Sequence, residues 1–321
     1  MFKPLSIHNA ADLAAFACLA ELAADKPGNV SLRRGLPGLT PTAFLHSAAA
    51  LRAAFSRRGR RSVGRLVLDT VRRTRRRVGT NTNLGLALIL APLAIAATRP
   101  AASARRRRAT ARRASPAGAR SAAPLPGLGR EWLRRRLRAT LRSLTRRDAE
   151  QVYEAIRLAH PAGMGKVARE DVRARPRRGL RACMALAQRR DSLAAEYARD
   201  YSITFEIGLP ALERGLGRGW PLRQAAVEAF LTILAARPDS LICRKHGVKL
   251  AREVSRRARA ALAAPPSVRA GTRAAAVRRR RSARAFDRWL RARRLNPGTT
   301  ADLTATAIFA ALASRFAGAK R

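Results

Sequence analysis

Five short segments of this 321-residue chain combine glycine with hydroxyl, amide and charged side chains in a way that suits the binding of phosphate groups. Glycine costs about 1 kcal/mol relative to alanine inside a helix, so it is used where backbone turns sharply or approaches a ligand. Each segment adjoins a stretch that predicts a helix. We therefore expect a phosphate- or nucleotide-sized ligand between helices, held by DKPGNV (25–30), GTNTNLG (79–85), HPAGMGKV (160–167), RPDSLICRKHG (237–247) and NPGTTADL (296–303).

The first two segments each allow a structural and a functional interpretation. DKPGNV is either a simple helix stop or a turn that places Lys26 and the free backbone N–H groups around Gly28 on a phosphate. GTNTNLG either caps the next helix through Thr82 or Asn83, or places Asn81, Thr82 and Asn83 around an anion at the helix N-terminus. It is not a Walker A loop, because it lacks the GK[ST] ending and a preceding strand.

HPAGMGKV is the most distinctive segment. His160 alone could be a cationic partner for the C-terminal end of a helix dipole. The full run His-Pro-x-Gly-x-Gly-Lys contains more glycine and charge than a helix stop requires. This pattern favours a ligand-binding role for His160, Gly163 and Gly165.

The last two segments place carboxylates at expected helix starts. Asp239 is a good N-cap, with Arg244 and Lys245 on a solvated face, but an acid and two cations on one turn also suit a nucleotide with its metal ion. Thr299 and Asp302 likewise fit a cap and a dipole-favoured acid in a first turn. Only the coincidence of five such segments favours a binding site.

The composition predicts an all-α protein with one multi-helix domain. Apolar residues make up 47% of the chain but aromatic residues only 5%, so the core is built from Ala, Leu, Val and Ile with few β-branched runs. We expect residues 1–98 and 131–321 to form one helical catalytic domain. Residues 99–130 lack apolar periodicity and are rich in Arg, Ala, Ser, Pro and Gly, which predicts a disordered insertion. Expected helices cover 10–24, 41–55, 63–77, 84–97, a segment that ends at about 160, 177–189, 191–206, 220–236, 240–262, 283–294 and 300–317, with a Pro/Arg/Ala-rich connector at 263–282. Thr40 is the expected N-cap before Pro41, and Thr145 with Asp148 resembles a capping box that opens the helix ending at about 160.

The net charge of +47 has three explanations: nucleic-acid binding, attraction of small polyanions, or compositional drift toward arginine and alanine. Only six of the 67 basic residues are lysine, which favours drift. A nucleic-acid-binding surface would interleave basic with aromatic residues, and aromatics are scarce here. Specific nucleic-acid recognition is therefore not favoured, although the charge alone predicts non-specific binding.

The cysteines and apolar runs indicate a cytoplasmic protein. Three cysteines without CxxC spacing argue against a disulfide framework or a zinc site and fit a reducing compartment. No secretory signal pattern is visible at the N-terminus. The apolar run 84–97 contains Pro92 and is shorter than the roughly 20 residues that span a bilayer, so we expect a buried helix and no membrane partner.

The ordered set of segments resembles the triphosphoribosyl-dephospho-CoA synthase family. The resemblance covers about residues 10–98 and 145–317 and leaves both Arg-rich stretches outside. It rests on ELAADKPGNV, GTNTNLG, AIRLAHPAGMGKV, RDSLAAEYARDYSITFE, RPDSLICRKHG and NPGTTADL, in this order.

This resemblance implies an all-helical enzyme. A ribose hydroxyl of dephospho-CoA would attack C1′ of the ATP ribose, and adenine would leave while the triphosphate stays on the transferred ribose. A nearby carboxylate would stabilise the positive charge that develops on the ribose, as in an oxocarbenium ion. Cations or Mg²⁺ would bind the triphosphate. Side-chain chemistry on the matching positions gives Asp239 as the carboxylate at the ribose or the metal, with Asp302 second. Phosphate and nucleotide ligands would be Lys26, Gly28, Asn81, Thr82, Asn83, His160, Gly163, Gly165, Arg244, Lys245 and Thr299.

The chain also departs from the family pattern. The stretch after the Lys-Pro-Gly turn, SLRRGLPGLT, contains no acid, whereas family members usually carry one there. In the best-known members Thr-Asn replaces Ser-Leu after the later Asp, and Thr-His-Lys replaces Thr-Asn-Leu in the GTNTNLG loop. The chain is more similar to a divergent branch found in methylotroph and archaeal C1 gene neighbourhoods. Two alternatives therefore stay open: a ribosyl-type transferase with another acceptor in C1-cofactor metabolism, and an inactive family member that serves as a scaffold.

Overall fold

A computed structural model describes residues 9–56, 62–98, 128–161, 163–263 and 273–318 of the chain. Within these residues the only β pairing consists of two isolated bridges, Ser31–Arg34 and Leu36–Leu39, so the all-α prediction is confirmed. In the same described ranges, no helix is both long and apolar enough to cross a membrane. The helices are α1 (Ala10–Leu22), α2 (Pro41–Phe55), α3 (Val63–Val78), α4 (Leu84–Thr98), α6 (Leu128–Arg142), α7 (Arg146–Ala159), α8 (Leu180–Ala187), α9 (Ser192–Ala198), the π-helix η1 (Thr204–Gly208), α10 (Leu209–Gly217), α11 (Leu222–Ala236), α12 (Ser240–His246), α13 (Val248–Leu262), α14 (Arg273–Ala292) and α15 (Gly298–Gly318).

Several helix starts follow directly from side-chain capping. Thr40 accepts a hydrogen bond from the Ala43 N–H just before Pro41, as the sequence predicts for the start of α2. Thr145 and Asp148 form the predicted capping box at the start of α7. Asp148 also accepts a hydrogen bond from the Gly64 N–H at 2.9 Å, so one carboxylate joins the first turns of α3 and α7.

Other boundaries differ from the sequence prediction. The helix expected over 240–262 is divided at Gly247, whose φ of 87° belongs to the left-handed side that glycine favours. The helix expected over 191–206 ends at Ala198, because Asp200 and Tyr201 adopt φ values of 51° and 59°. Helices α6 and α10 were not among the expected ones, and α14 begins ten residues earlier than the expected 283–294. The expected insertion at 99–130 lies largely outside the described residues, which resume at 128.

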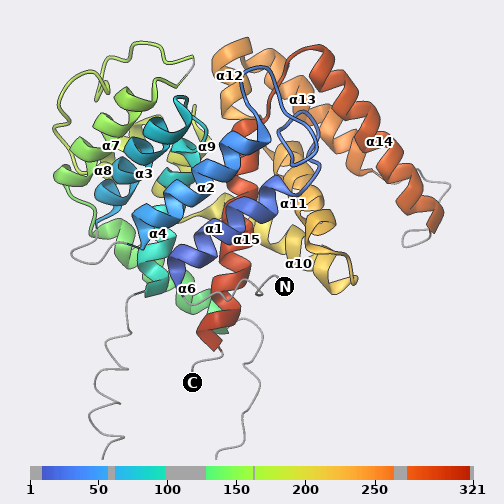
Figure 1. Cartoon of the computed structure of the whole chain (residues 1–321), viewed down its shortest axis with the longest axis horizontal. Coiled ribbons are helices and arrows are strands. Elements are labelled where there is room, and N and C mark those ends of the chain that lie inside the picture. Colours follow the sequence, from blue (N-terminus) through green and yellow to red (C-terminus); the bar gives the residue numbers. More distant parts are fainter. Residues whose placement is uncertain (1–8, 57–61, 99–127, 162, 264–272, 319–321) are drawn as a thin grey trace, which may run out of the picture.

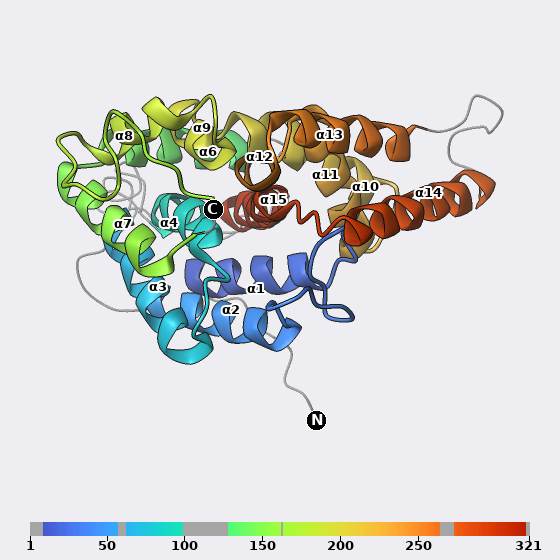
Figure 2. The same ribbon diagram turned by 90° about the horizontal axis from the view of Figure 1, so that it is seen from above.

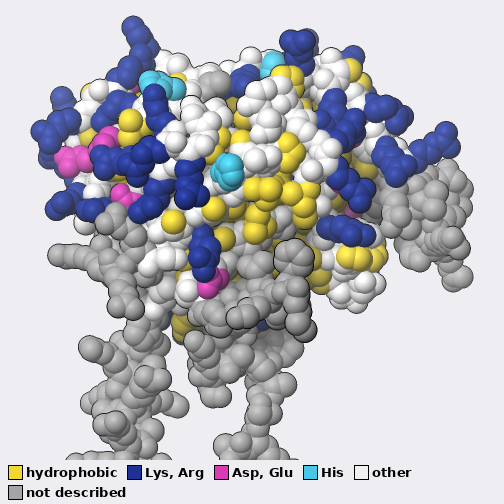
Figure 3. All heavy atoms as spheres, viewed as in Figure 1, with side chains coloured by type: hydrophobic (Ala, Val, Ile, Leu, Met, Phe, Trp, Pro, Cys, Tyr) yellow, Lys and Arg dark blue, Asp and Glu magenta, His cyan; other side chains and the backbone are white. Residues whose placement is uncertain are grey.

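Helix α15 is the axis of the fold. It runs through the middle of the molecule and packs against α1, α4, α6 and α11 (Figure 1). The main hydrophobic core surrounds α4 and α15, and a second cluster joins α11, α12, α13 and α14. The outer surface carries the excess of basic charge: Lys and Arg side chains cover both flanks of the face in Figure 3, and acids are few. The charge is therefore separated from a core made mainly of small aliphatic residues.

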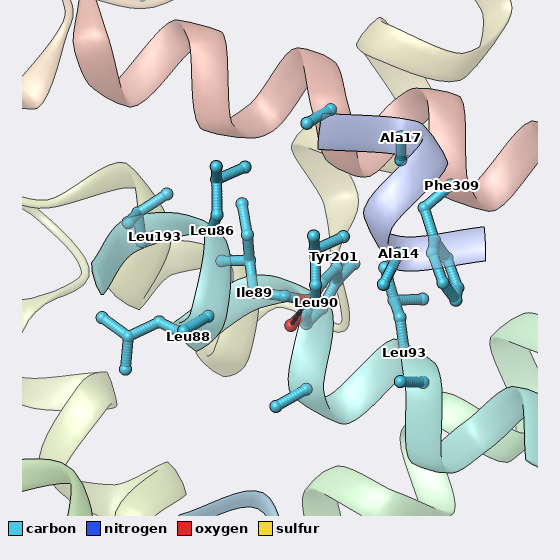
Figure 4. Close-up of a cluster of buried hydrophobic side chains, with 14 of the residues drawn as sticks. Ala14, Ala17, Leu86, Leu88, Ile89, Leu90, Leu93, Leu193, Tyr201 and Phe309 are labelled. Atoms are coloured by element: carbon cyan, nitrogen blue, oxygen red, sulfur yellow. Dashed lines mark hydrogen bonds between the residues drawn. The ribbon is translucent and has the colours of Figure 1, made fainter. Parts of the chain in front are cut away.

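Helix α4 is buried almost throughout and contains Pro92, which has no N–H to donate to the carbonyl of Leu88 one turn earlier. Two tyrosines supply donors from the neighbouring segment. The Tyr197 hydroxyl donates to the Leu88 carbonyl at 2.6 Å, and the Tyr201 hydroxyl donates to the Ile89 carbonyl at 2.8 Å. Figure 4 shows Tyr201 beside Ile89 and Leu90 in this cluster. Burial of both tyrosines raises the pKa of each hydroxyl above its usual range, which keeps them neutral donors.

We predict that Tyr197→Phe lowers the free energy of unfolding by about 1–3 kcal/mol, because the buried Leu88 carbonyl then loses its donor. The loss should be smaller in a Pro92→Ala background, where the backbone N–H that alanine restores can bond to that carbonyl. Urea unfolding of the four proteins in this double-mutant cycle measures the difference. An equal loss in both backgrounds would show that the hydroxyl acts independently of the proline.

Candidate active site

A cavity of about 1000 Å³ opens at the end of the bundle where α4, α9, α12 and α15 begin and where α1, α3 and α7 end. Figure 2 looks onto this end, with the loop from α3 to α4 crossing its middle. Parts of four of the five predicted segments line the cavity, as does Asn29 of the fifth. The sequence-predicted residues among its lining are Asn81, Thr82, Asn83, His160, Gly163, Gly165, Arg244, Lys245, Thr299 and Asp302.

Asp302 is the central carboxylate of this cavity. It lies in the second turn of α15, half-buried, and none of the described residues donates a hydrogen bond to its side chain. Its carboxylate packs over the backbone of Gly85 so closely that a Cβ there would lie 1.9 Å from Asp302 Oδ2. Burial, together with the charges of Glu21, Asp239 and Asp191, raises the pKa of Asp302 well above its usual value, whereas Arg244 lowers it.

Arg244 is held at the cavity wall by Asp191. The Asp191 Oδ2 atom lies 2.5 Å from Arg244 Nη1, while Oδ1 caps α9 by accepting from the N–H groups of Leu193 and Ala194. The glycine-rich loop covers the same arginine, because a Cβ on Gly163 would lie 3.0 Å from the Arg244 Cβ. The Gly163 φ of 78° also favours glycine at this position. Glycine is thus required here for close packing between loop and helix.

The GTNTNLG loop is fixed to α2 and α3 by its own side chains. Asn83 is buried, and its amide donates to the Ser47 carbonyl at 3.1 Å and to Thr74 Oγ1 at 2.9 Å. Thr82 and Ser47 share a short hydroxyl–hydroxyl hydrogen bond. Asn81 accepts from the Leu84 N–H at 3.2 Å, so it is Asn81 that caps α4, where the sequence suggested Thr82 or Asn83. These contacts hold the N-terminus of α4 toward the cavity.

Exposed cations surround the cavity. They are Arg75, Lys166, Arg169, Arg190 and Lys245, in addition to the half-buried Arg244. The N-termini of the long helices α4 and α15 add partial positive charge at the cavity floor. This combination attracts a polyanion, and Asp302 is the acid positioned to face whatever cationic group develops there.

Asp239 does not line the cavity, contrary to the role expected for it. Its side chain is buried, and both oxygens are used within the protein. Oδ1 caps α12 by accepting from the N–H groups of Leu241 and Ile242 at 2.9 and 3.1 Å. Oδ2 accepts from the N–H and the hydroxyl of Thr300, both at 2.8 Å, at the start of α15. Asp239 therefore joins two helix starts, and its oxygens are not available to a metal ion.

Lys26 and Gly28 also lie outside the cavity lining. The Lys26 ammonium is buried, with Glu21 Oε1 at 2.8 Å and the carbonyl oxygens of Glu21, Ala24 and Val30 at 2.6–3.3 Å. Gly28 donates its N–H to Asp287 Oδ1 at 2.8 Å and adopts a φ of 72°, which lets α14 pack against this turn. The turn formed by DKPGNV therefore stabilises the packing of α14 against the end of α1.

Four acids that line the cavity were not among the predicted site residues: Glu21, Glu170, Asp171 and Asp191. Glu21, near the end of α1, lines the cavity, and burial raises its pKa while Lys26 opposes that rise. Asp191 lines the cavity beside Arg244. Two sequence patterns contain two of these acids: Glu21 lies five residues before Lys26, and Asp191 is the first acid of RDSLAAEYARDYSITFE. Neither pattern indicates that its acid faces a cavity.

Comparisons with known proteins identify a family and a similar solved structure. The family model CitG, described as ATP:dephospho-CoA triphosphoribosyl transferase, matches residues 7–321. Among solved structures, the chain is similar to a protein from Archaeoglobus fulgidus provisionally described as a triphosphoribosyl-dephospho-CoA synthase. The two share 25% sequence identity with a TM-score of 0.59, over 85% of this chain and 98% of that one. The comparison with curated proteins finds no match.

We predict that Lys26→Met lowers the free energy of unfolding by about 3–5 kcal/mol, because Glu21 would then be a buried acid without a counter-charge. Lys249→Met, at an exposed lysine on α13, is the matched control and should change stability by less than about 0.5 kcal/mol. Chemical denaturation measures both. Unchanged stability in Lys26→Met together with lost ATP binding would instead support the phosphate-binding role first expected for this lysine.

Proposed function

This chain belongs to the family of ATP:dephospho-CoA triphosphoribosyl transferases, and from that membership we propose that it joins a ribose hydroxyl of dephospho-CoA to C1′ of the ATP ribose. In this reaction the new C1′–O bond replaces the C1′–N9 bond. The hydroxyl proton leaves the acceptor, and adenine departs with a proton on its ring. The observation that supports this proposal best is Asp302, a carboxylate without a protein partner among the described residues, inside a cation-lined cavity.

The size of the cavity suits two substrates together. Sites for single drug-sized ligands span about 300–1,000 Å³, and this cavity lies at the upper end of that range with about 1000 Å³. Direct transfer between two nucleotides requires that both be bound at once. Holding both in line reduces the entropic part of the barrier.

Asp302 has two roles in this proposal. Its carboxylate stabilises positive charge that develops at C1′ as the bond to adenine lengthens. It also accepts the proton of the attacking hydroxyl, and its raised pKa suits a general base. Gly85 makes room for the carboxylate, and Asp239 positions the start of the helix that carries it.

The triphosphate would lie against the cationic side of the cavity. Arg244, Lys245 and Lys166 could bind phosphate oxygens there, and Asp191 keeps the Arg244 guanidinium at the wall. Thr299, Asn81 and the α4 N-terminus offer further polar groups.

The described residues do not build a resident magnesium site at the cavity. Within the described residues, no group of three or more histidine, cysteine or acidic side chains is arranged to hold a metal. Mg²⁺ bound to a triphosphate needs only one or two carboxylates, because water and phosphate oxygens complete its shell. Both oxygens of Asp239 are hydrogen-bonded elsewhere and Asp302 is assigned to C1′, so an ion would enter the site with the triphosphate. When bound, the ion would neutralise charge on the triphosphate.

The experiment that tests this function is adenine release. The purified protein is incubated with ATP and Mg²⁺, with and without dephospho-CoA, and the products are followed by mass spectrometry. Adenine together with triphosphoribosylated dephospho-CoA is the expected result. A cytoplasmic location would give the protein access to both substrates. If adenine is released only with another acceptor, the transferase activity stands and dephospho-CoA is not the acceptor. No release with any acceptor would favour the scaffold alternative.

We predict that Asp302→Asn lowers kcat by roughly 100-fold or more, because it removes the base and the charge at C1′. Gly85→Ala should have a comparable effect, since its Cβ would displace the carboxylate. Asp69→Asn, at an acid on α3 that does not line the cavity, is the control and should retain activity. If Asp302→Asn stays active while Asp239→Asn, folded normally, does not, the catalytic assignment returns to Asp239.

We also predict the direction of a shift in the pH profile. The acidic limb of kcat/KM should follow ionisation of Asp302, so activity rises as the pH passes its raised pKa. Asp191→Asn removes one negative charge that raises this pKa and frees Arg244, whose charge lowers it, while the amide oxygen can still cap α9. The limb should therefore move to lower pH in the variant. ATP titrates identically in both assays, so an unchanged limb would show that Asp302 does not control it.

A further inference from the structure

The proposed reaction places strict demands on the surroundings of Asp302. The leaving adenine is bonded directly to C1′, and the attacking hydroxyl belongs to a ribose that carries its own adenine. Two purine rings must therefore lie no farther from the reacting carbon than about the width of one ribose. A displacement in which the attacking oxygen approaches opposite the leaving nitrogen also places the two rings on opposite sides of it. The site thus needs two separate apolar regions beside one carboxylate.

The cavity has such a region on each side of its polar centre. One is lined by α3, α7 and α8, including Val152, Tyr153 and Met184. The other is lined by Pro37, Leu39 and Phe44, from the loop before α2 and its first turn. Figure 2 shows the loop between α1 and α2 on one side of the first turns of α4 and α15, and α7 and α8 on the other.

The cations distinguish the two ends. Lys166, Arg169 and Arg190 line the cavity on the loops beside α7, α8 and α9, together with Arg244 and Lys245 of α12. Arg75 of α3 also lines the cavity, and its guanidinium donates to the Leu158 carbonyl of α7. None of the lysines and arginines in the described lining belongs to the segment that contains Pro37, Leu39 and Phe44. The triphosphate and its ribose therefore belong toward α7, α8 and α12, which leaves the Phe44 end for the acceptor.

Phe44 is well suited to stack on a base. It is half-buried in a chain with few aromatic residues, and its turn of α2 is fixed by a hydrogen bond from the Ser47 hydroxyl to the Ala43 carbonyl at 2.7 Å. Ser47 also bonds to Thr82, so this turn is tied to the GTNTNLG loop that borders Asp302. Tyr153 at the other end is almost fully buried, and its hydroxyl donates to the Glu170 carbonyl.

We propose that Pro37, Leu39 and Phe44 form the subsite for the base of a nucleoside-bearing acceptor, with Phe44 as the residue that determines its affinity. This inference rests on the proposed transferase function and names the side from which the second substrate enters. Phe44 binds the acceptor but not ATP, so it controls one of the two Michaelis constants.

The test compares Phe44→Ala, Phe44→Tyr and the wild type in steady-state assays with ATP and dephospho-CoA. Stacking of a base on an aromatic ring corresponds to roughly a five- to 100-fold change in affinity, so Phe44→Ala should raise the KM for dephospho-CoA by such a factor. The KM for ATP should change less than about twofold, and Phe44→Tyr should restore the acceptor KM. Leu45→Ala, at an exposed neighbour outside the cavity lining, is the matched control.

Equilibrium binding of ATP and dephospho-CoA by calorimetry separates this inference from the proposed function. If the wild type binds both nucleotides but releases no adenine, the transferase proposal fails, while weaker dephospho-CoA binding by Phe44→Ala would still support the subsite. If Phe44→Ala binds dephospho-CoA as the wild type does, or loses ATP affinity instead, the assignment of Phe44 is overturned.

Discussion

The geometry of the site depends on a buried helix that cannot complete its own hydrogen bonds. Pro92 removes a donor in the middle of α4, and Tyr197 and Tyr201 donate to the carbonyls beside it. Tyr197 lies near the end of α9 and Tyr201 in the segment that follows, where Asp200 and Tyr201 adopt left-handed backbone angles. Because both bonds are buried, they fix α4 against that segment. The N-terminus of α4, with Gly85, is thereby held against Asp302.

Four acids near helix starts differ in their hydrogen-bond partners. Asp148 and Asp239 each join the starts of two helices, and Asp191 joins a helix start to an arginine. Their oxygens accept the otherwise unpaired N–H groups of first turns, which is sufficient reason for an acid at each position. Asp302 follows a different pattern, because its carboxylate faces a cavity and accepts no bond from the described residues. An unpaired acid among cations is a feature that folding alone does not require.

Much of the fold was predictable from local chemistry. The apolar run with Pro92, the Thr145–Asp148 capping box and the Thr40–Pro41 helix start each identify an element by its own residues. The segments that gather at the cavity could also be recognised, because glycine and polar residues recur beside helix ends. The direction of individual side chains could not. Lys26 and Asp239 have the chemistry of ligands, but Lys26 turns inward to Glu21 and Asp239 lies between two helix starts, and such placement depends on tertiary packing. Likewise, nothing local predicts left-handed angles at Asp200 and Tyr201.

The unpaired carboxylate has a thermodynamic consequence for the free protein. With Asp302, Glu21 and Asp191 all facing one cavity, the empty fold carries mutual repulsion that a cationic or metal-bound ligand would relieve. A ligand that binds only the folded chain raises its apparent stability in proportion to the logarithm of ligand concentration. Folding and substrate supply are therefore linked at Asp302: a nucleotide that binds beside this acid would also add to the stability of the folded chain.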